Sequence, residues 1–185
     1  MTAAAAALAL IPARGGSKGI PGKNLQEVEG VPLVGRSVQA ALASTRVSRV
    51  VVSTDDDAIA AAARSHGAEV VRRPEHLAGD TASSESALLH ALEQLSTAGP
   101  LPPRLVFLQC TSPFTSGEQI DQVLAALDAP AVNSSFAVAP WHGFLWRGDG
   151  RGINHDPQQP RQRRQDLEPA YLAVSYTHLT LPTKA

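Results

Sequence analysis

Cysteine is almost absent from the 185-residue chain, which contains Cys110 alone. A single thiol cannot form an internal disulfide or build a cysteine-rich metal cluster. We expect it to be a buried packing residue and not a nucleophile. A basic excess is absent as well, because 16 lysines and arginines face 17 aspartates and glutamates, for a formal net charge of -1. We therefore expect no nucleic-acid partner, and any anion site must be local.

Long apolar runs are also lacking, and none approaches the roughly 20 residues that a membrane-spanning helix needs. The apolar start of the chain has no positive charge before it, so we interpret it as a buried strand and not as a signal peptide. Together with the lone thiol, these absences predict a cytoplasmic protein with no membrane partner. The length and the 43% apolar content suit one globular domain.

Short apolar runs alternate with segments of helical period, which is typical of a parallel sheet covered by crossover helices. Strands are expected at residues 5–12, 49–54, 68–71, 105–109 and 134–138, and helices at residues 32–42, 58–66, 84–95 and 117–128. This order predicts an α/β fold with an open, doubly wound, mostly parallel sheet. After Pro140 the pattern weakens, and we expect a long functional loop there.

A loop rich in glycine and positive charge follows the first expected strand, over residues 11–25 (IPARGGSKGIPGKNL). Its four glycines allow backbone N–H groups to approach phosphate oxygens, and Arg14, Lys18 and Lys23 supply three cations. Open α/β sheets bind ligands at this edge, so the loop predicts a triphosphate site. Its spacing matches neither the P-loop nor the dinucleotide fingerprint. The alternative is an ordinary solvated turn, which requires neither three cations nor four glycines.

The same loop resembles the N-terminal signature of the acylneuraminate cytidylyltransferases, also called CMP-sialic acid synthetases. Later segments resemble further motifs of that family in the same order: residues 51–55 (VVSTD), 73–84 (RPEHLAGDTASS), 108–113 (LQCTSP) and 163–167 (RRQDL). The resemblance covers residues 7–171 and implies a nucleotidyltransferase-type, Rossmann-like sheet. Cytidylyltransferases for 3-deoxy-octulosonate have a similar loop with a different central sequence.

The resemblance assigns the CTP phosphates to residues of the glycine-rich loop. These residues are Arg14, Gly15, Ser17, Lys18, Lys23 and Asn24. Arg14 and Lys23 are also the candidates for catalysis, because they would neutralise charge on the triphosphate.

The resemblance also places Arg73 and Ser84 at the cytosine base, and Gln109 and Arg164 at the acid sugar. From the residues alone, other interpretations stay open. Arg73 could be an exposed charge before a proline, and Ser84 could be a helix N-cap. Gln109 could be an ordinary residue at a strand end, and Arg164 could belong to a solvated cationic run.

The implied reaction transfers CMP from CTP to the anomeric hydroxyl of an N-acylneuraminate-type acid sugar, which releases pyrophosphate and forms CMP-sialic acid. Mg²⁺ or another divalent cation is expected, but no metal ligand can be named, because the aspartate block of the family does not occur in this sequence. A homodimer is expected for the full-length protein. The alternatives are a cytidylyltransferase for another nonulosonate, legionaminate or pseudaminate, and an inactive CTP-binding fragment.

The expected cytidylyltransferase domain covers residues 1–174 and is incomplete at its C-terminal end. After Tyr171 the sequence departs from the family pattern, and residues 175–185 (SYTHLTLPTKA) continue neither a helix nor a strand. We interpret this tail as non-native.

Overall fold

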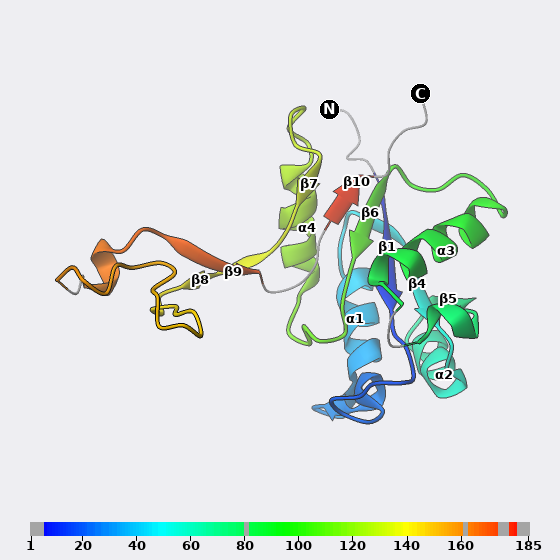
Figure 1. The fold of residues 1–185 in the computed structure, drawn as a ribbon. Coiled ribbons are helices and arrows are strands. Elements are labelled where there is room, and N and C mark those ends of the chain that lie inside the picture. The colour runs from blue at the N-terminus through cyan, green and yellow to red at the C-terminus, as the bar shows by residue number, and fades with distance from the viewer. Residues whose placement is uncertain (1–5, 80–81, 161–162, 174–177, 181–185) are drawn as a thin grey trace. The chain divides into compact units, whose positions relative to one another are not determined.

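The computed structural model describes residues 6–79, 82–160, 163–173 and 178–180 (Figure 1). Contacts between these residues divide the chain into two compact units. The first contains the residues up to Phe136 together with the strand at 178–180, and the second begins at Ala137 and includes residue 173. No helix in the described ranges has the length and apolar character needed to cross a bilayer.

The first unit is built on a six-stranded sheet with the order β5-β4-β1-β6-β10-β7. Its strands are β1 (Ala7–Pro12), β4 (Val47–Thr54), β5 (Glu69–Arg72), β6 (Arg104–Phe107), β7 (Ser134–Ser135) and β10 (His178–Thr180). β1 pairs in parallel with β4 and with β6, and β4 pairs in parallel with β5. β10 runs antiparallel to β6 and β7. The carboxyl ends of four parallel strands therefore meet at one edge.

Helices cover both faces of this sheet (Figure 1). They are α1 (Leu33–Leu42), α2 (Asp57–Ser65), α3 (Ser84–Ser96) and α4 (Gly117–Ala126). Along β1, Ala9 and Ile11 pack with α1, α2 and α4, whereas Leu8 and Leu10 pack with α3. Burial on both faces explains why β1 is an unbroken apolar run and not an alternating one. The predicted doubly wound α/β class is confirmed.

Polar caps fix the starts of the helices that follow the parallel strands. Asp56 caps α2 by accepting a hydrogen bond from the Ile59 amide at 2.8 Å, and Ser116 caps α4. Ser83 caps α3, since its hydroxyl accepts from the Ser86 amide at 3.1 Å. The interpretation of Ser84 as this cap is therefore wrong by one residue. Each cap lies at the end of a loop that follows the carboxyl end of a parallel strand.

A short hairpin links the glycine-rich loop to α1. After the 3-10 helix η1 (Lys23–Leu25), β2 (Glu27–Val28) pairs antiparallel with β3 (Val31–Pro32). Its turn places Glu29 and Gly30 at φ of 55° and 75°, and two successive positive φ values suit a tight hairpin. Another 3-10 helix, η2 (Glu75–Leu77), follows β5.

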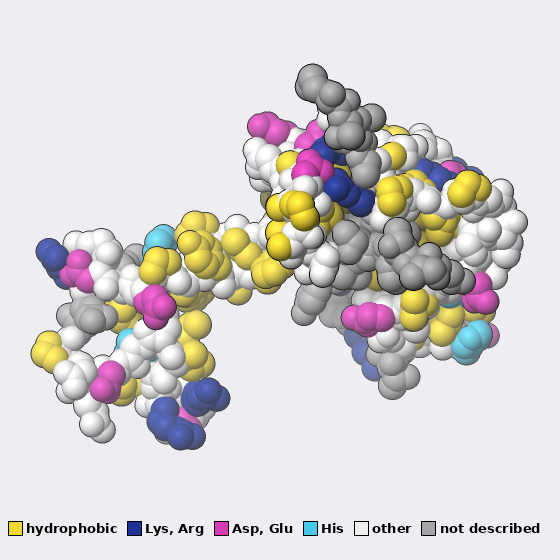
Figure 2. Space-filling model, turned by 90° about the horizontal axis from the view of Figure 1, so that it is seen from above, with side chains coloured by type: hydrophobic (Ala, Val, Ile, Leu, Met, Phe, Trp, Pro, Cys, Tyr) yellow, Lys and Arg dark blue, Asp and Glu magenta, His cyan; other side chains and the backbone are white. Residues whose placement is uncertain are grey.

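The strand predicted at residues 134–138 is divided between the two units. Only Ser134 and Ser135 pair in the sheet, as β7. Val138 instead begins β8 (Val138–Trp141), which forms an antiparallel ribbon with β9 (Ala170–Ala173) in the second unit. The second unit also contains η3 (Arg164–Asp166). The stretch predicted as a loop after Pro140 thus includes a two-stranded ribbon. Hydrophobic side chains lie along the surface of the second unit (Figure 2).

The predicted non-native tail contributes β10 to the sheet of the first unit. Sequence analysis did not predict this strand, because three residues are too few to show a hydrophobic period. The interpretation of residues 175–185 as non-native stays a prediction.

Candidate functional site

A pocket of about 300 Å³ lies at the carboxyl edge of the parallel strands. Its lining comes from the ends of β1, β5 and β6 and from the start of α3: Pro12, Arg14, Ser17, Lys23, Asn24, Arg73, Ala82, Ser83, Ser84, Gln109, Cys110 and Thr111. Seven of the ten residues predicted from the sequence are in this lining. The fold therefore brings together segments that lie far apart in the sequence, at the edge where open α/β sheets bind ligands.

The glycine-rich loop is held by its own polar groups. Asn24 is buried, and its side-chain amide donates to the carbonyl oxygen of Arg14 at 3.0 Å. The guanidinium of Arg14 donates to the carbonyl of Gly79 at 2.9 Å, between residues 65 positions apart. Lys23 begins η1 and lines the pocket. Asn24 thus shapes the loop from within, while Arg14 and Lys23 supply positive charge to the cavity.

Gly15 and Lys18 belong to the predicted phosphate set but not to the residues that line the pocket. The Gly15 amide donates to Asp55 Oδ1 at 3.1 Å. A Cβ at Gly15 would lie 2.8 Å from Asp56 Oδ2, so only glycine allows this close approach. Sequence analysis missed Asp55, whose position directly after β4 was the available signal.

Arg73 is buried, with 8% of its surface exposed, so its interpretation as an exposed charge is wrong. Its guanidinium donates to the carbonyl of Ser53 at 2.8 Å and to the Ser53 hydroxyl at 3.3 Å. Burial lowers the pKa of Arg73 most, the negative charge of Asp55 raises this pKa, and the positive charge of Arg14 lowers it. An arginine stays protonated under such shifts, so the pocket holds a third cation.

The part of the lining that comes from the start of α3 and from the segment after β6 is made of small and polar uncharged residues. Ser84 is the first residue of α3, next to the capping Ser83. After β6, the Thr111 hydroxyl donates to Gln109 Oε1 at 3.4 Å. Cys110 lies between them with 3% exposure, and burial raises its thiol pKa to about 11. The prediction of a buried Cys110 is confirmed, and Ser83 and Thr111 are lining residues that sequence analysis missed.

Two predictions from the sequence remain, and they concern Arg164 and the metal ion. Arg164 begins η3 in the second unit, but its side chain lies outside the described residues, so its predicted sugar contact stays a prediction. Within the described ranges, no group of three or more histidine, cysteine, aspartate or glutamate side chains could hold a metal ion. Mg²⁺ often needs only one or two carboxylates besides substrate phosphates, so the expected divalent cation stays a prediction.

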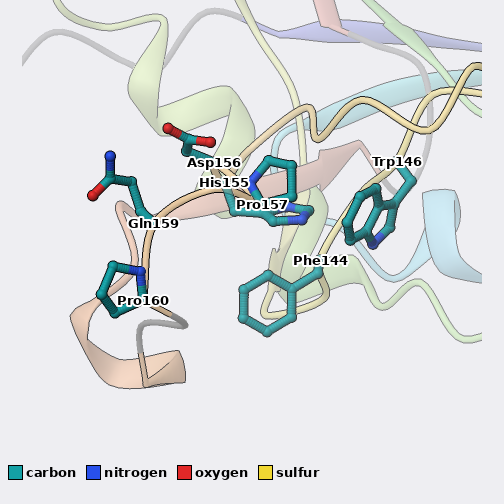
Figure 3. Close-up of a pocket in the computed structure, with 7 residues that line it drawn as sticks. All are labelled: Phe144, Trp146, His155, Asp156, Pro157, Gln159 and Pro160. Atoms are coloured by element: carbon teal, nitrogen blue, oxygen red, sulfur yellow. The ribbon is translucent and has the colours of Figure 1, made fainter.

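A separate cavity of about 410 Å³ lies within the second unit (Figure 3). His155 meets Phe144 and Trp146 edge-to-face, with ring centroids 4.9 and 4.5 Å apart. Prolines 157 and 160 extend this mainly apolar lining, and Asp156 adds a negative charge. The cavity contains none of the residues predicted for the site, and its chemistry does not suit a triphosphate.

A doubly wound sheet with a glycine-rich, cationic pocket at its carboxyl edge defines a nucleotide-binding α/β protein. The chain belongs to the cytidylyltransferase family, because the family model described as "Cytidylyltransferase" matches residues 8–143.

Curated relatives agree with this assignment. The N-acylneuraminate cytidylyltransferase of Oncorhynchus mykiss is 36% identical over 167 residues, which cover 86% of this chain and 38% of that protein. The pseudaminic acid cytidylyltransferase of Campylobacter jejuni is 31% identical over 170 residues, which cover 89% of this chain and 73% of that protein. The chain thus spans about two fifths of the length of the first relative.

Among solved structures, a CMP:2-keto-3-deoxy-manno-octonic acid synthetase complexed with CTP has a similar fold. The TM-score is 0.70 at 19% identity, and the match covers 95% of this chain and 74% of that one. At this identity the likeness shows a shared fold.

Proposed function

We propose that the first unit binds CTP and transfers CMP to the anomeric hydroxyl of an N-acylneuraminate-type acid sugar, with release of pyrophosphate and formation of CMP-sialic acid. One observation carries this proposal: a single pocket gathers Arg14, Lys23 and Arg73 at the carboxyl edge of the sheet. The name of the Oncorhynchus mykiss relative supports the choice of reaction.

In the proposed reaction, the anomeric hydroxyl of the sugar attacks the α-phosphorus of CTP, and its proton passes to solvent. The bond from that phosphorus to the bridging oxygen breaks, and pyrophosphate leaves in line with the attack. Arg14 and Lys23 lower the barrier by neutralising the charge that grows on the leaving phosphates. The glycine-rich loop, held by Asn24, fixes the position of these charges before the substrate arrives.

The other walls of the pocket supply selectivity in this proposal. Arg73 and Ser84 face the cytosine base, and a pocket built to hydrogen-bond one pyrimidine edge leaves polar groups unpaired when another base enters. Gln109, held beside Thr111, contacts the acid sugar in this proposal. The family resemblance alone makes Arg164 the candidate partner of the sugar carboxylate.

Mg²⁺ or another divalent cation, a homodimer and a cytoplasmic location are further parts of the proposal. The ion would neutralise phosphate charge together with Arg14 and Lys23. The homodimer is supported by the ribbon of the second unit, where Trp141, Tyr171 and Leu172 are 36%, 62% and 54% exposed. Large exposed apolar side chains of this kind suit a protein interface.

A second candidate substrate is another nonulosonate, with pseudaminate favoured by the 31% identical relative from Campylobacter jejuni. This alternative retains the triphosphate pocket and changes only the sugar contacts.

The test measures pyrophosphate release with CTP, Mg²⁺ and a panel of acid sugars, and it measures nucleotide competition for binding. We expect turnover with N-acetylneuraminate and a preference for CTP over UTP, ATP and GTP. Faster turnover with pseudaminate or legionaminate would select the second candidate. Selective CTP binding without turnover would identify a binding fragment, and equal binding of ATP and CTP would contradict the proposed site.

A further inference from the structure

Asp55 lies directly after β4, the strand between β1 and β5. The glycine-rich loop leaves the end of β1, and Arg73 follows the end of β5. Asp55 is half-buried and is not a lining residue of the pocket. It nevertheless stands between the two segments that carry most of the positive charge of the pocket.

The first contact of Asp55 is with the backbone of the loop. Its Oδ1 accepts a hydrogen bond from the Gly15 amide at 3.1 Å, between residues 40 positions apart in the sequence. The lack of a side chain at Gly15 makes room for the neighbouring Asp56, which is itself fixed as the cap of α2. One charge-assisted hydrogen bond therefore ties the start of the loop to the end of β4.

The second interaction of Asp55 is with the charge of Arg73. Within the described part of the chain, the Arg73 side chain donates its two hydrogen bonds to neutral oxygens of Ser53, and no ion pair joins it to a carboxylate. Asp55 provides a negative charge that favours protonated Arg73, whereas Arg14 disfavours it. Because Arg73 is buried, this long-range attraction is only weakly screened by solvent.

We propose that Asp55 is a positioning residue with two separable roles: its oxygen holds Gly15 in place, and its charge limits how strongly the pocket attracts phosphates that carry no base. This inference rests on the CTP site proposed above. Three cations in one pocket attract any polyanion, including the pyrophosphate product. A carboxylate behind them weakens that general attraction, so the contacts to the base contribute a larger share of the selectivity.

The two roles are separated by Asp55→Asn, which keeps an oxygen acceptor and removes the charge, and by Asp55→Ala, which removes both. Asp57→Asn is the matched control. Asp57 lies two residues away, its side chain is 97% exposed, and it forms an ion pair with Arg72 at 3.0 Å. Asp57→Asn therefore removes one negative charge close to the end of β4, from a side chain that has no hydrogen bond to Gly15.

Two measurements are made on the full chain. Hydrogen exchange followed by NMR reports the protection of the Gly15 amide, and isothermal titration gives the affinities for inorganic pyrophosphate and for CTP. We expect Asp55→Asn to retain Gly15 protection and to bind pyrophosphate about threefold to tenfold more tightly than wild type. Its affinity for CTP should rise less, and Asp55→Ala should lose the Gly15 protection.

Equal gains in pyrophosphate affinity for Asp55→Asn and Asp57→Asn would overturn the charge role, since net charge alone would then explain them. An unchanged Gly15 amide in Asp55→Ala would overturn the positioning role. If wild type binds CTP no better than UTP, the proposed function fails instead. The Gly15 exchange and the pyrophosphate comparison still decide the roles of Asp55 in that case.

Discussion

Replacing Arg73 with methionine should separate nucleotide binding from stability. The change removes a buried guanidinium and keeps an unbranched side chain in its place. Among the described residues, this guanidinium donates two hydrogen bonds, both to Ser53, at 2.8 and 3.3 Å. If Arg73 serves the nucleotide, its loss should affect binding far more than folding.

The expected effect on stability is small because two contributions oppose each other. Each lost hydrogen bond reduces the free energy of unfolding by about 0.5–1.5 kcal/mol. The Ser53 carbonyl keeps a partner, since it also accepts from the Ala13 amide at 2.9 Å. Removing the buried guanidinium also removes the cost of keeping its charge out of water, which offsets part of this loss. We therefore expect Arg73→Met to unfold within about 1 kcal/mol of the wild-type value.

The expected effect on CTP binding is large. A hydrogen bond from a charged donor contributes about 1.5–3 kcal/mol, which corresponds to a tenfold to roughly 150-fold loss of affinity. Isothermal titration with CTP and urea unfolding measure the two effects on the same protein.

Arg49→Met is the control for this prediction. Arg49 lies on β4, the strand that also carries Ser53, and forms a two-bond ion pair with Glu69, at 2.7 and 2.8 Å. It is not a lining residue of the pocket. Its loss should reduce stability by about 1 kcal/mol or less and leave CTP affinity unchanged. The reasoning is refuted if Arg73→Met unfolds more than about 2 kcal/mol more easily while its CTP affinity equals that of wild type.

Three further changes test the pocket and its surroundings. Lys23→Ala should weaken CTP binding about tenfold or more, because it removes a charge-assisted phosphate contact, and isothermal titration measures this loss. Gln26→Ala, at an exposed position, should leave CTP affinity unchanged, and equal affinities for the two variants would contradict the assignment of the loop. Gly15→Ala should lower the unfolding free energy by about 1 kcal/mol, because the added Cβ pushes aside the Asp56 carboxylate that caps α2. Gly16→Ala is the control, since an added Cβ there meets nothing within 4 Å, and urea unfolding compares the two variants. Burial raises the pKa of the Cys110 thiol to about 11, so the contribution of this thiol to stability is present below about pH 9 and is lost as the pH rises towards 11. Cys110→Ala should not show this loss of unfolding free energy, and identical pH profiles for the variant and the wild type would contradict the prediction.

The amino-acid sequence by itself determines the fold class and the segment that forms the glycine-rich loop. Both depend on local patterns: apolar runs that alternate with helical periods, and four glycines with three cations directly after a strand. Such patterns lie within a few residues of one another, so they are visible before folding. The wall residues Arg73, Ser84 and Gln109 were found through resemblance to a family, and the structure places all three in the lining.

Tertiary structure alone decided what each of these residues contacts. The burial of Arg73 against Ser53 and the hydrogen bond between Gly15 and Asp55 join residues 20 and 40 positions apart. The division of the strand predicted at residues 134–138 depended in the same way on distant partners, because β7 pairs with β10 and β8 with β9. Hydrophobic periodicity reports which face of an element is buried, but not which strand lies beside it. Strand neighbours are selected by the packing of the whole sheet, and the contacts at its carboxyl edge follow from that order.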